Sequence, residues 1–180
     1  HRSSAASDVY KRQALFNAIA HAESVDGKQT NREDSVPPLT SVLVETIELD
    51  TTVGKIKGRT DGEIATFQGI PYAEAPVGDN RWRPPIALQS FDTTLDATKF
   101  GSACMQRRRT GYFADPRPVS EDCLTLNIWS TNHIKKAKPV IVWIHGGAFV
   151  IGSSKFPFYD GEAFARSGIV FVSINYRLGR

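Results

Sequence analysis

The stretch PVIVWIHGGAFV, from Pro139 to Val150, decides the fold class. Its first half, Pro139–Ile144, is continuously apolar, which is typical of a strand covered on both faces of a sheet. The side chains then almost vanish at Gly146, Gly147 and Ala148, where the chain leaves that strand. Small residues let backbone N–H groups turn toward a ligand with no Cβ in the way. Such donors, aimed at one point, can form an oxyanion hole, and a tight turn after a strand is the alternative interpretation.

The segments on either side of this stretch predict an α/β architecture. Leu124–Trp129 alternates between apolar and polar residues, as a half-buried strand does. Gly161–Ser167 is predicted to form a short helix that ends at Gly168, and Ile169–Ile174 to form another buried strand. Strand, helix and strand in this order favour an α/β sheet. The apolar face of the first of these strands consists of Leu124, Leu126 and Ile128.

Further toward the N-terminus, the pattern predicts short strands joined by a hairpin. Val42–Leu49 is rich in β-branched residues and is predicted to be a strand. Val53–Arg59 and Glu63–Phe67 are two short runs separated by Asp61-Gly62, which is a strong turn signal between strands.

Composition and length limit the kinds of protein that this chain can be. The 180 residues fit one domain of ordinary size, and a content of 41% hydrophobic and 23% charged residues excludes wholesale disorder. A net charge of +3 is too weak to indicate nucleic acid or an anionic membrane as a partner. No apolar run approaches the ~20 residues of a membrane-spanning helix.

The chain divides into two parts. Residues 1–38 are interpreted as a disordered or non-native leader that ends at Pro37-Pro38, and residues 39–180 as the body.

Several motifs in the body together resemble a known family, the type B carboxylesterases, which include cholinesterases and fungal lipases. The resemblance runs from about Thr46 to Arg180. The segments that carry it are Gly69–Gly78 (GIPYAEAPVG), Arg81–Pro85 (RWRPP), Glu121–Ile128 (EDCLTLNI), His145–Phe149 (HGGAF) and Ser173–Gly179 (SINYRLG).

The resemblance implies an α/β-hydrolase fold, of which this chain would be the N-terminal portion only. Initial antiparallel strands would lead into the first strands of a mixed, mostly parallel central sheet. It also implies serine-dependent hydrolysis of a small-molecule carboxylic ester, and we expect no cofactor. We expect no metal site either, because two cysteines so far apart, with no clustered histidines, lack the spacing of metal ligands. By position, Gly147 and Ala148 would donate the N–H groups of an oxyanion hole, and Gly146 would shape the turn. The family more often has a third glycine where Ala148 stands.

The catalytic triad expected of such a hydrolase is not found in these 180 residues. The nucleophile motif Gly-x-Ser-x-Gly does not occur, and the nearest pattern, Gly58–Gly62, has a threonine at its centre and falls in the predicted hairpin. In the family, the serine, acid and histidine lie further along than this chain reaches, so we expect the chain alone to be inactive. None of the four histidines is predicted to be a general base; they are His1, His21, His133 and His145.

Two residue pairs have structural roles by resemblance. The family commonly pairs cysteines at the places of Cys104 and Cys123, which would favour a secreted protein, while two thiols in a reducing compartment are the alternative. Arg81 and Glu121 occupy positions where the family forms an internal ion pair.

Two other functions stay open at this point. Some cholinesterase-like proteins keep the fold without the serine and serve as binding or adhesion modules. Hydrolases of the hormone-sensitive-lipase type share a His-Gly-Gly motif, but they do not account for Glu121–Ile128 or Gly69–Gly78. The sequence indicates neither the ester nor the oligomeric state.

Overall fold

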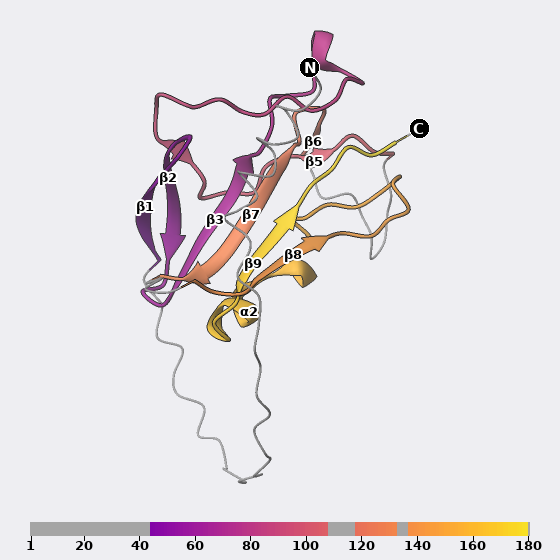
Figure 1. Cartoon of the computed structure of the whole chain (residues 1–180). Coiled ribbons are helices and arrows are strands. Elements are labelled where there is room, and N and C mark those ends of the chain that lie inside the picture. The colour runs from indigo at the N-terminus through magenta and orange to yellow at the C-terminus, as the bar shows by residue number, and fades with distance from the viewer. Residues whose placement is uncertain (1–43, 108–117, 133–136, 180) are drawn as a thin grey trace.

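The computed structural model describes residues 44–107, 118–132 and 137–179. The leader expected over residues 1–38, with its boundary to the body, lies outside the described residues. Within them, seven strands form one mixed sheet in the order β1-β2-β3-β7-β9-β8, with β4 beside β2 (Figure 1). The bounds of these strands are β1 Glu45–Thr51, β2 Gly54–Thr60, β3 Ile64–Pro71, β4 Leu95–Asp96, β7 Thr125–Thr131, β8 Val140–Ile144 and β9 Val170–Ile174.

The remaining elements are short. Two strands form a small parallel pair apart from the main sheet, and the connections within the described ranges hold one α-helix and two 3-10 turns. Their bounds are β5 Ala103–Cys104, β6 Val119–Ser120, α2 Glu162–Arg166, η2 Gly78–Asn80 and η3 Pro157–Tyr159. Among the described residues, no helix is both long and apolar enough to cross a membrane.

The hairpin predicted at Asp61-Gly62 is confirmed. Strands β2 and β3 pair antiparallel on either side of these two residues. The Asp61 carboxylate accepts hydrogen bonds from the N–H groups of Glu63 and Ile64, at 2.9 and 2.6 Å, which closes the turn. Gly62 has a φ of 93°, a conformation that glycine adopts without a steric cost.

Strand β3 continues beyond Phe67, where the sequence pattern predicted its end. A register shift between Phe67 and Ile70 lets the strand run on to Pro71 while still pairing with β7. Gly69 lies in this bulge with a φ of 71°, and a Cβ there would come within 2.6 Å of the Lys99 carbonyl oxygen. The glycine therefore permits a close backbone approach and does not end the strand.

The main sheet is mixed, as expected, but it is not mostly parallel in the described part of the chain. Strands β1, β2, β3, β7 and β9 pair antiparallel in succession, and parallel pairing joins only β8 to β9 and β4 to β2. The expectation that Pro139–Ile144 is covered on both faces was wrong for this structure. The last three residues of this strand, Val142, Trp143 and Ile144, are 49%, 40% and 62% exposed. Strand β8 is the edge strand of the described sheet, so no further strand lies beside it there (Figure 1).

Strand β7 is central in the sheet, where it pairs with β3 along one edge and with β9 along the other. The predicted apolar face, with Leu126 and Ile128, is half-buried, whereas Asn127 and Trp129 on the opposite face are 1% and 2% exposed. Trp129 packs with Phe171 of β9, with Ile64 of β3 and with Ala165 of α2. The predicted helix is thus confirmed as α2, and it covers this face of the sheet. The strand predicted over Ile169–Ile174 is confirmed as β9, whose middle residues are buried.

Candidate active-site loop

The glycine loop, residues 145–152, leaves the sheet at the end of β8 and has an unusual backbone. Three successive residues have positive φ: 130° at Gly147, 52° at Ala148 and 60° at Phe149. The left-handed conformation costs a non-glycine residue about 1–2 kcal/mol, and such strain persists only where surrounding contacts impose it. At Gly147 a Cβ would overlap the Ile151 carbonyl oxygen, so glycine is required at this point of the loop. Gly146, in contrast, has open space where a Cβ would stand.

The backbone N–H groups at the tip of this loop have no hydrogen-bond acceptor among the residues that the structure describes. The N–H groups of Val150 and Ile151 both donate to the Gly147 carbonyl oxygen, at 3.0 and 3.1 Å, and so close the turn. The N–H groups of Gly147, Ala148 and Phe149 donate to no acceptor within the described part of the chain. Gly147 is half-buried and the next two residues are exposed, so a ligand can reach these donors.

The segment that follows β9 holds the loop from one side. The Tyr176 hydroxyl donates to the His145 carbonyl oxygen at 2.6 Å, and the Gly179 N–H donates to the Phe149 carbonyl oxygen at 2.8 Å. The His145 ring stacks on the Tyr176 ring with centroids 4.4 Å apart. Two motifs that the sequence singled out, His145–Phe149 and Ser173–Gly179, therefore meet in space.

The buried side chain of His145 contacts the backbone of the glycine loop at Gly146. Its residue is 2% exposed, and ring nitrogen Nδ1 lies 2.9 Å from the Gly146 carbonyl oxygen, to which the Nδ1–H tautomer donates. Burial lowers the pKa of His145 below its ordinary value, and the bond to Gly146 partly opposes this shift. The imidazole is therefore neutral at pH 7 and packs inside the protein. His1, His21 and His133 lie outside the described residues.

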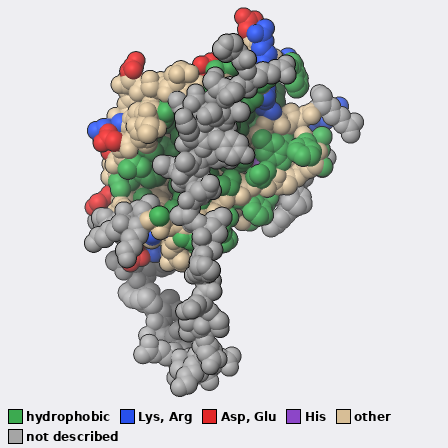
Figure 2. Space-filling model, in the orientation of Figure 1, with side chains coloured by type: hydrophobic (Ala, Val, Ile, Leu, Met, Phe, Trp, Pro, Cys, Tyr) green, Lys and Arg blue, Asp and Glu red, His purple; other side chains and the backbone are tan. Residues whose placement is uncertain are grey.

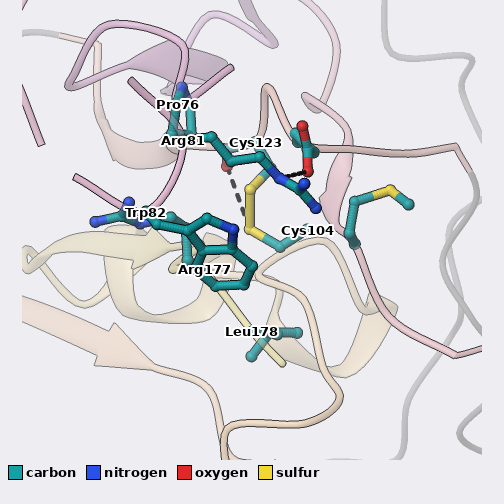
Figure 3. A pocket seen from close by; sticks show the side chains of 9 residues that line it. Pro76, Arg81, Trp82, Cys104, Cys123, Arg177 and Leu178 are labelled. Atoms are coloured by element: carbon teal, nitrogen blue, oxygen red, sulfur yellow. Dashed lines mark hydrogen bonds and ion pairs between the residues drawn. A yellow bond between two sulfur atoms is a disulfide. The ribbon is translucent and has the colours of Figure 1, made fainter. Parts of the chain in front are cut away.

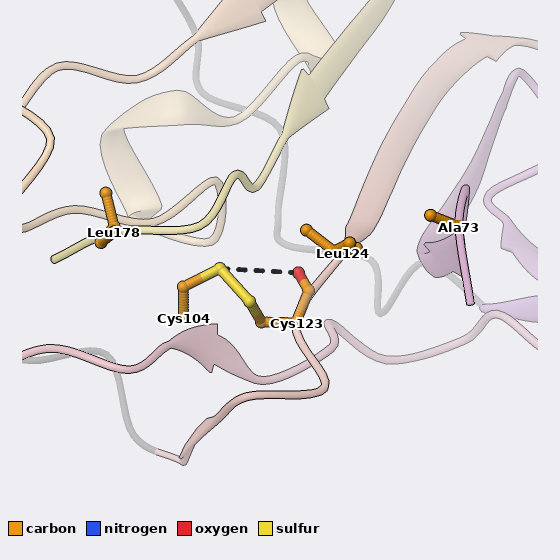
Figure 4. Close-up of a cluster of buried hydrophobic side chains, with 5 residues drawn as sticks. All are labelled: Ala73, Cys104, Cys123, Leu124 and Leu178. Atoms are coloured by element: carbon orange, nitrogen blue, oxygen red, sulfur yellow. Dashed lines mark hydrogen bonds between the residues drawn. A yellow bond between two sulfur atoms is a disulfide. The ribbon is translucent and has the colours of Figure 1, made fainter. Parts of the chain in front are cut away.

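Cys104 and Cys123 form a disulfide, as the resemblance implied, with Cα atoms 5.0 Å apart. The residues are 2% and 1% exposed, and they pack in one apolar cluster with Ala73, Leu124 and Leu178. Figure 4 shows the disulfide between Leu178 and Leu124. The alternative of two free thiols does not hold in this structure.

Arg81 and Glu121 form an ion pair, with Nε and Oε1 2.5 Å apart. Their side chains are 54% and 35% exposed, so the pair is closer to a surface pair than to a buried one. It lines a pocket beside the disulfide (Figure 3). The pocket is completed by Pro76, Trp82, Met105, Arg177 and Leu178.

Near this pocket, the sequence singled out Trp82 only as part of the motif Arg81–Pro85, and it did not single out Gln106. Trp82 has a φ of 62° and is 69% exposed, with the Arg81 guanidinium carbon 5.3 Å from its ring centroid. Gln106 hydrogen-bonds through both amide atoms to Gly152, the last residue of the glycine loop. No periodicity or spacing could have indicated either feature, because both depend on contacts or torsions of single residues.

The nearest approach to a nucleophile motif is a turn, as interpreted from the sequence. Thr60, at the centre of Gly58–Gly62, ends β2, and its hydroxyl oxygen accepts the N–H of Gly62 at 3.0 Å. Groups of three or more His, Cys, Asp or Glu side chains suited to a metal do not occur among the described residues.

Comparison with known proteins gives a consistent result. A family model described as the carboxylesterase family matches residues 45–180. The fumonisin B1 esterase of Sphingopyxis macrogoltabida is 43% identical over 130 residues, which are 72% of this chain and 24% of that protein. The para-nitrobenzyl esterase of Bacillus subtilis is 43% identical over 133 residues, which are 72% of this chain and 27% of that protein.

Solved structures show the same likeness. The carboxylesterase EST55 of Geobacillus stearothermophilus superposes with a TM-score of 0.66 at 42% identity, over 73% of this chain and 26% of that one. The chain thus spans about a quarter of the length of the relatives that it matches. The fold is accordingly part of an α/β-hydrolase fold.

Proposed function

This chain belongs to the carboxylesterase family, and on that premise we propose that it is part of a serine-dependent carboxylic ester hydrolase, in which the glycine loop supplies the oxyanion hole. The proposed donors are the backbone N–H groups of Gly147 and Ala148, in a turn that begins at Gly146. The substrate would be a small-molecule carboxylic ester.

The free amides at the loop tip are the observation that carries this proposal. Ester hydrolysis places negative charge on the carbonyl oxygen as the tetrahedral intermediate forms, and fixed N–H donors stabilise that charge. Gly147 and Ala148 have such donors with no acceptor among the described residues. Because the donors are backbone groups, the methyl group of Ala148 leaves the chemistry of its N–H unchanged.

The attacking group would come from residues that this sequence does not contain, since it has no Gly-x-Ser-x-Gly motif. In the proposed reaction a serine oxygen bonds to the ester carbonyl carbon while a histidine accepts its proton. The carbon–alkoxy bond then breaks, and the alcohol leaves with that proton while the acyl group stays on the serine. Water then attacks the same carbonyl carbon, the acid leaves and the serine is regenerated. The loop would stabilise both tetrahedral intermediates.

A binding or adhesion module without catalysis is the alternative proposal. It would have no use for the strained backbone at Ala148 and Phe149, whose N–H groups have no acceptor among the described residues. The strain therefore favours the hydrolase.

The full reading frame tests the proposal directly. We expect it to encode a Gly-x-Ser-x-Gly motif after residue 180, and the purified protein to hydrolyse p-nitrophenyl butyrate. Replacing that serine with alanine should abolish turnover and labelling by a fluorophosphonate probe. A full-length protein without the motif, or one that is inert to both reagents, would favour the binding module.

Gly147→Ala tests the loop itself. Its Cβ would overlap the Ile151 carbonyl oxygen, so the loop must move, and we expect kcat to fall by about 10²-fold or more, the usual cost of losing one oxyanion donor. Gly168→Ala is the matched control, because Gly168 also has a positive φ, 82°, but lies after α2 with open space around its Cα. Equal kcat values for the two variants would contradict the role of the loop.

A further inference from the structure

We propose that Gln106 is a positioning residue for the oxyanion donors. It holds the glycine loop at Gly152 and connects it to Cys104 of the disulfide. This inference rests on the proposed function for its catalytic consequence, but its structural part concerns only contacts among described residues.

Gln106 holds both backbone polar groups of Gly152. Its Nε2 donates to the Gly152 carbonyl oxygen at 2.9 Å, and its Oε1 accepts the Gly152 N–H at 2.9 Å. A side-chain amide carries a donor and an acceptor side by side, so it can pair with both backbone groups of one residue as a neighbouring strand does. Two hydrogen bonds to one residue restrict both its distance and its orientation. The contact therefore fixes the position of Gly152, the last residue of the glycine loop, relative to Gln106.

Gly152 in turn lies directly against the start of the loop. With a φ of 121°, its Cα faces the His145 ring, and a Cβ there would overlap Nδ1 and come within 2.6 Å of the Gly146 carbonyl oxygen. Gly147 is packed equally tightly against the Ile151 carbonyl. Because both ends of the loop touch in this way, a displacement of Gly152 shifts the peptide units that carry the proposed donors.

The position of Gln106 is set by the disulfide. The side chain makes a third hydrogen bond, in which Nε2 also donates to the Cys104 carbonyl oxygen at 3.0 Å. Cys104 is buried, bonded to Cys123, and lies in the short strand β5 that pairs with β6. A continuous set of contacts therefore leads from the disulfide through Gln106 to the loop amides.

The residues after Gly152 have a separate anchor. Ser154 donates its N–H to the Asn175 side-chain oxygen at 2.8 Å, and the Ser153 hydroxyl lies 3.3 Å from the same atom. All three residues are at most 2% exposed. This buried network does not involve Gln106, so a variant at that position should fold and lose only the restraint on the loop.

Gln106→Glu is the sharpest test. The carboxylate keeps the size of the side chain and can still accept the Gly152 N–H, but it places an oxygen against the Gly152 carbonyl oxygen. Gln89→Glu is the matched control, because it introduces the same charge at an exposed position in a loop.

Two readouts in the full-length protein separate positioning from packing. For Gln106→Glu, we expect kcat to fall by about 10- to 100-fold while KM changes by less than about 3-fold, since misplacement of a group by 1 Å can cost 10²-fold in rate. Affinity for a trifluoromethyl ketone, which mimics the tetrahedral oxyanion, should fall by the same factor as kcat. Gln89→Glu should match the wild type in both.

The second readout does not need activity. The N–H groups of Val150 and Ile151 are bonded to Gly147 and not to Gln106, so their hydrogen exchange reports the shape of the loop. We expect their exchange, resolved by mass spectrometry with electron-transfer fragmentation, to accelerate at least about 10-fold in Gln106→Glu and to stay unchanged in Gln89→Glu.

The outcomes distinguish the two proposals. An inactive wild type would overturn the proposed function, and the exchange of Val150 and Ile151 would then decide the role of Gln106. If Gln106→Glu leaves the hydrogen exchange of Val150 and Ile151 unchanged, the positioning role is wrong. It is also wrong if the wild type is active and Gln106→Glu has the same kcat.

Discussion

Reduction of the Cys104–Cys123 disulfide should destabilise the protein by an amount that the length of the closed loop sets. The two cysteines are 19 residues apart in the sequence. A cross-link of this span removes enough freedom from the unfolded chain to contribute about 3 kcal/mol. With a urea dependence of about 1–3 kcal/mol per molar, the midpoint of unfolding should fall by about 1 to 3 M on reduction.

Urea titrations of the oxidised and reduced protein, followed by tryptophan fluorescence, measure this difference. Trp129 is 2% exposed and packs in the core beside Phe171, so its emission should shift to the red on unfolding. The double variant Cys104→Ala/Cys123→Ala is the control for packing. It should unfold at the same urea concentration with and without reductant, and below the reduced wild type, because each substitution leaves a small cavity in a buried cluster.

The reasoning would be refuted by oxidised and reduced proteins that unfold at the same urea concentration. A lower midpoint in the double variant together with no effect of reductant on the wild type would show that the cysteines contribute only by packing.

Three further predictions concern charge, pH and activity. A double-mutant cycle on Arg81 and Glu121 should give a coupling of about 0.2–1 kcal/mol, because both side chains are partly exposed, and zero coupling would show that the ion pair does not contribute to stability. His145 has a lowered pKa in the folded protein, so its contribution to stability is fully present above its unfolded value of about 6.5 and is lost as the pH falls below it. An NMR titration of its ring should give a pKa below 6.5, and a higher value would contradict its burial. The 180-residue chain alone should not hydrolyse p-nitrophenyl acetate, and turnover that disappears on replacing one particular serine of this chain would prove otherwise.

Features whose cause is local were predictable from the sequence. The hairpin at Asp61-Gly62 and the helix before Gly168 depend on a few neighbouring residues, and both occur where expected. The disulfide between Cys104 and Cys123 was available only through the resemblance, because spacing alone does not show whether two cysteines are bonded or remain free thiols.

Features that depend on distant contacts were not predictable. The burial of Asn127 on a central strand requires Gly69, Ser154 and Ser173 as hydrogen-bond partners, each supplied by a different segment. The contact of Gln106 with Gly152 spans 46 residues. The exposure of β8 likewise follows from its place in the sheet and not from its own apolar sequence. In the candidate site, the glycine loop could be located, but the left-handed backbone at Ala148 and Phe149 could not.

The strand order β7-β9-β8 also has a consequence for synthesis on the ribosome. Strand β8 is made before β9, yet it joins the sheet only outside β9, so it must wait until residue 174 has been added. At ~5–20 residues per second, the ~30 residues between the two strand ends take ~2–6 seconds. Figure 2 shows hydrophobic side chains at the surface of one face of the molecule. Val142, Trp143 and Ile144 of β8 remain exposed even after β9 has paired with it. During that interval the nascent strand VIVWI lacks its neighbour in the sheet, and any change that delays β9 lengthens its exposure.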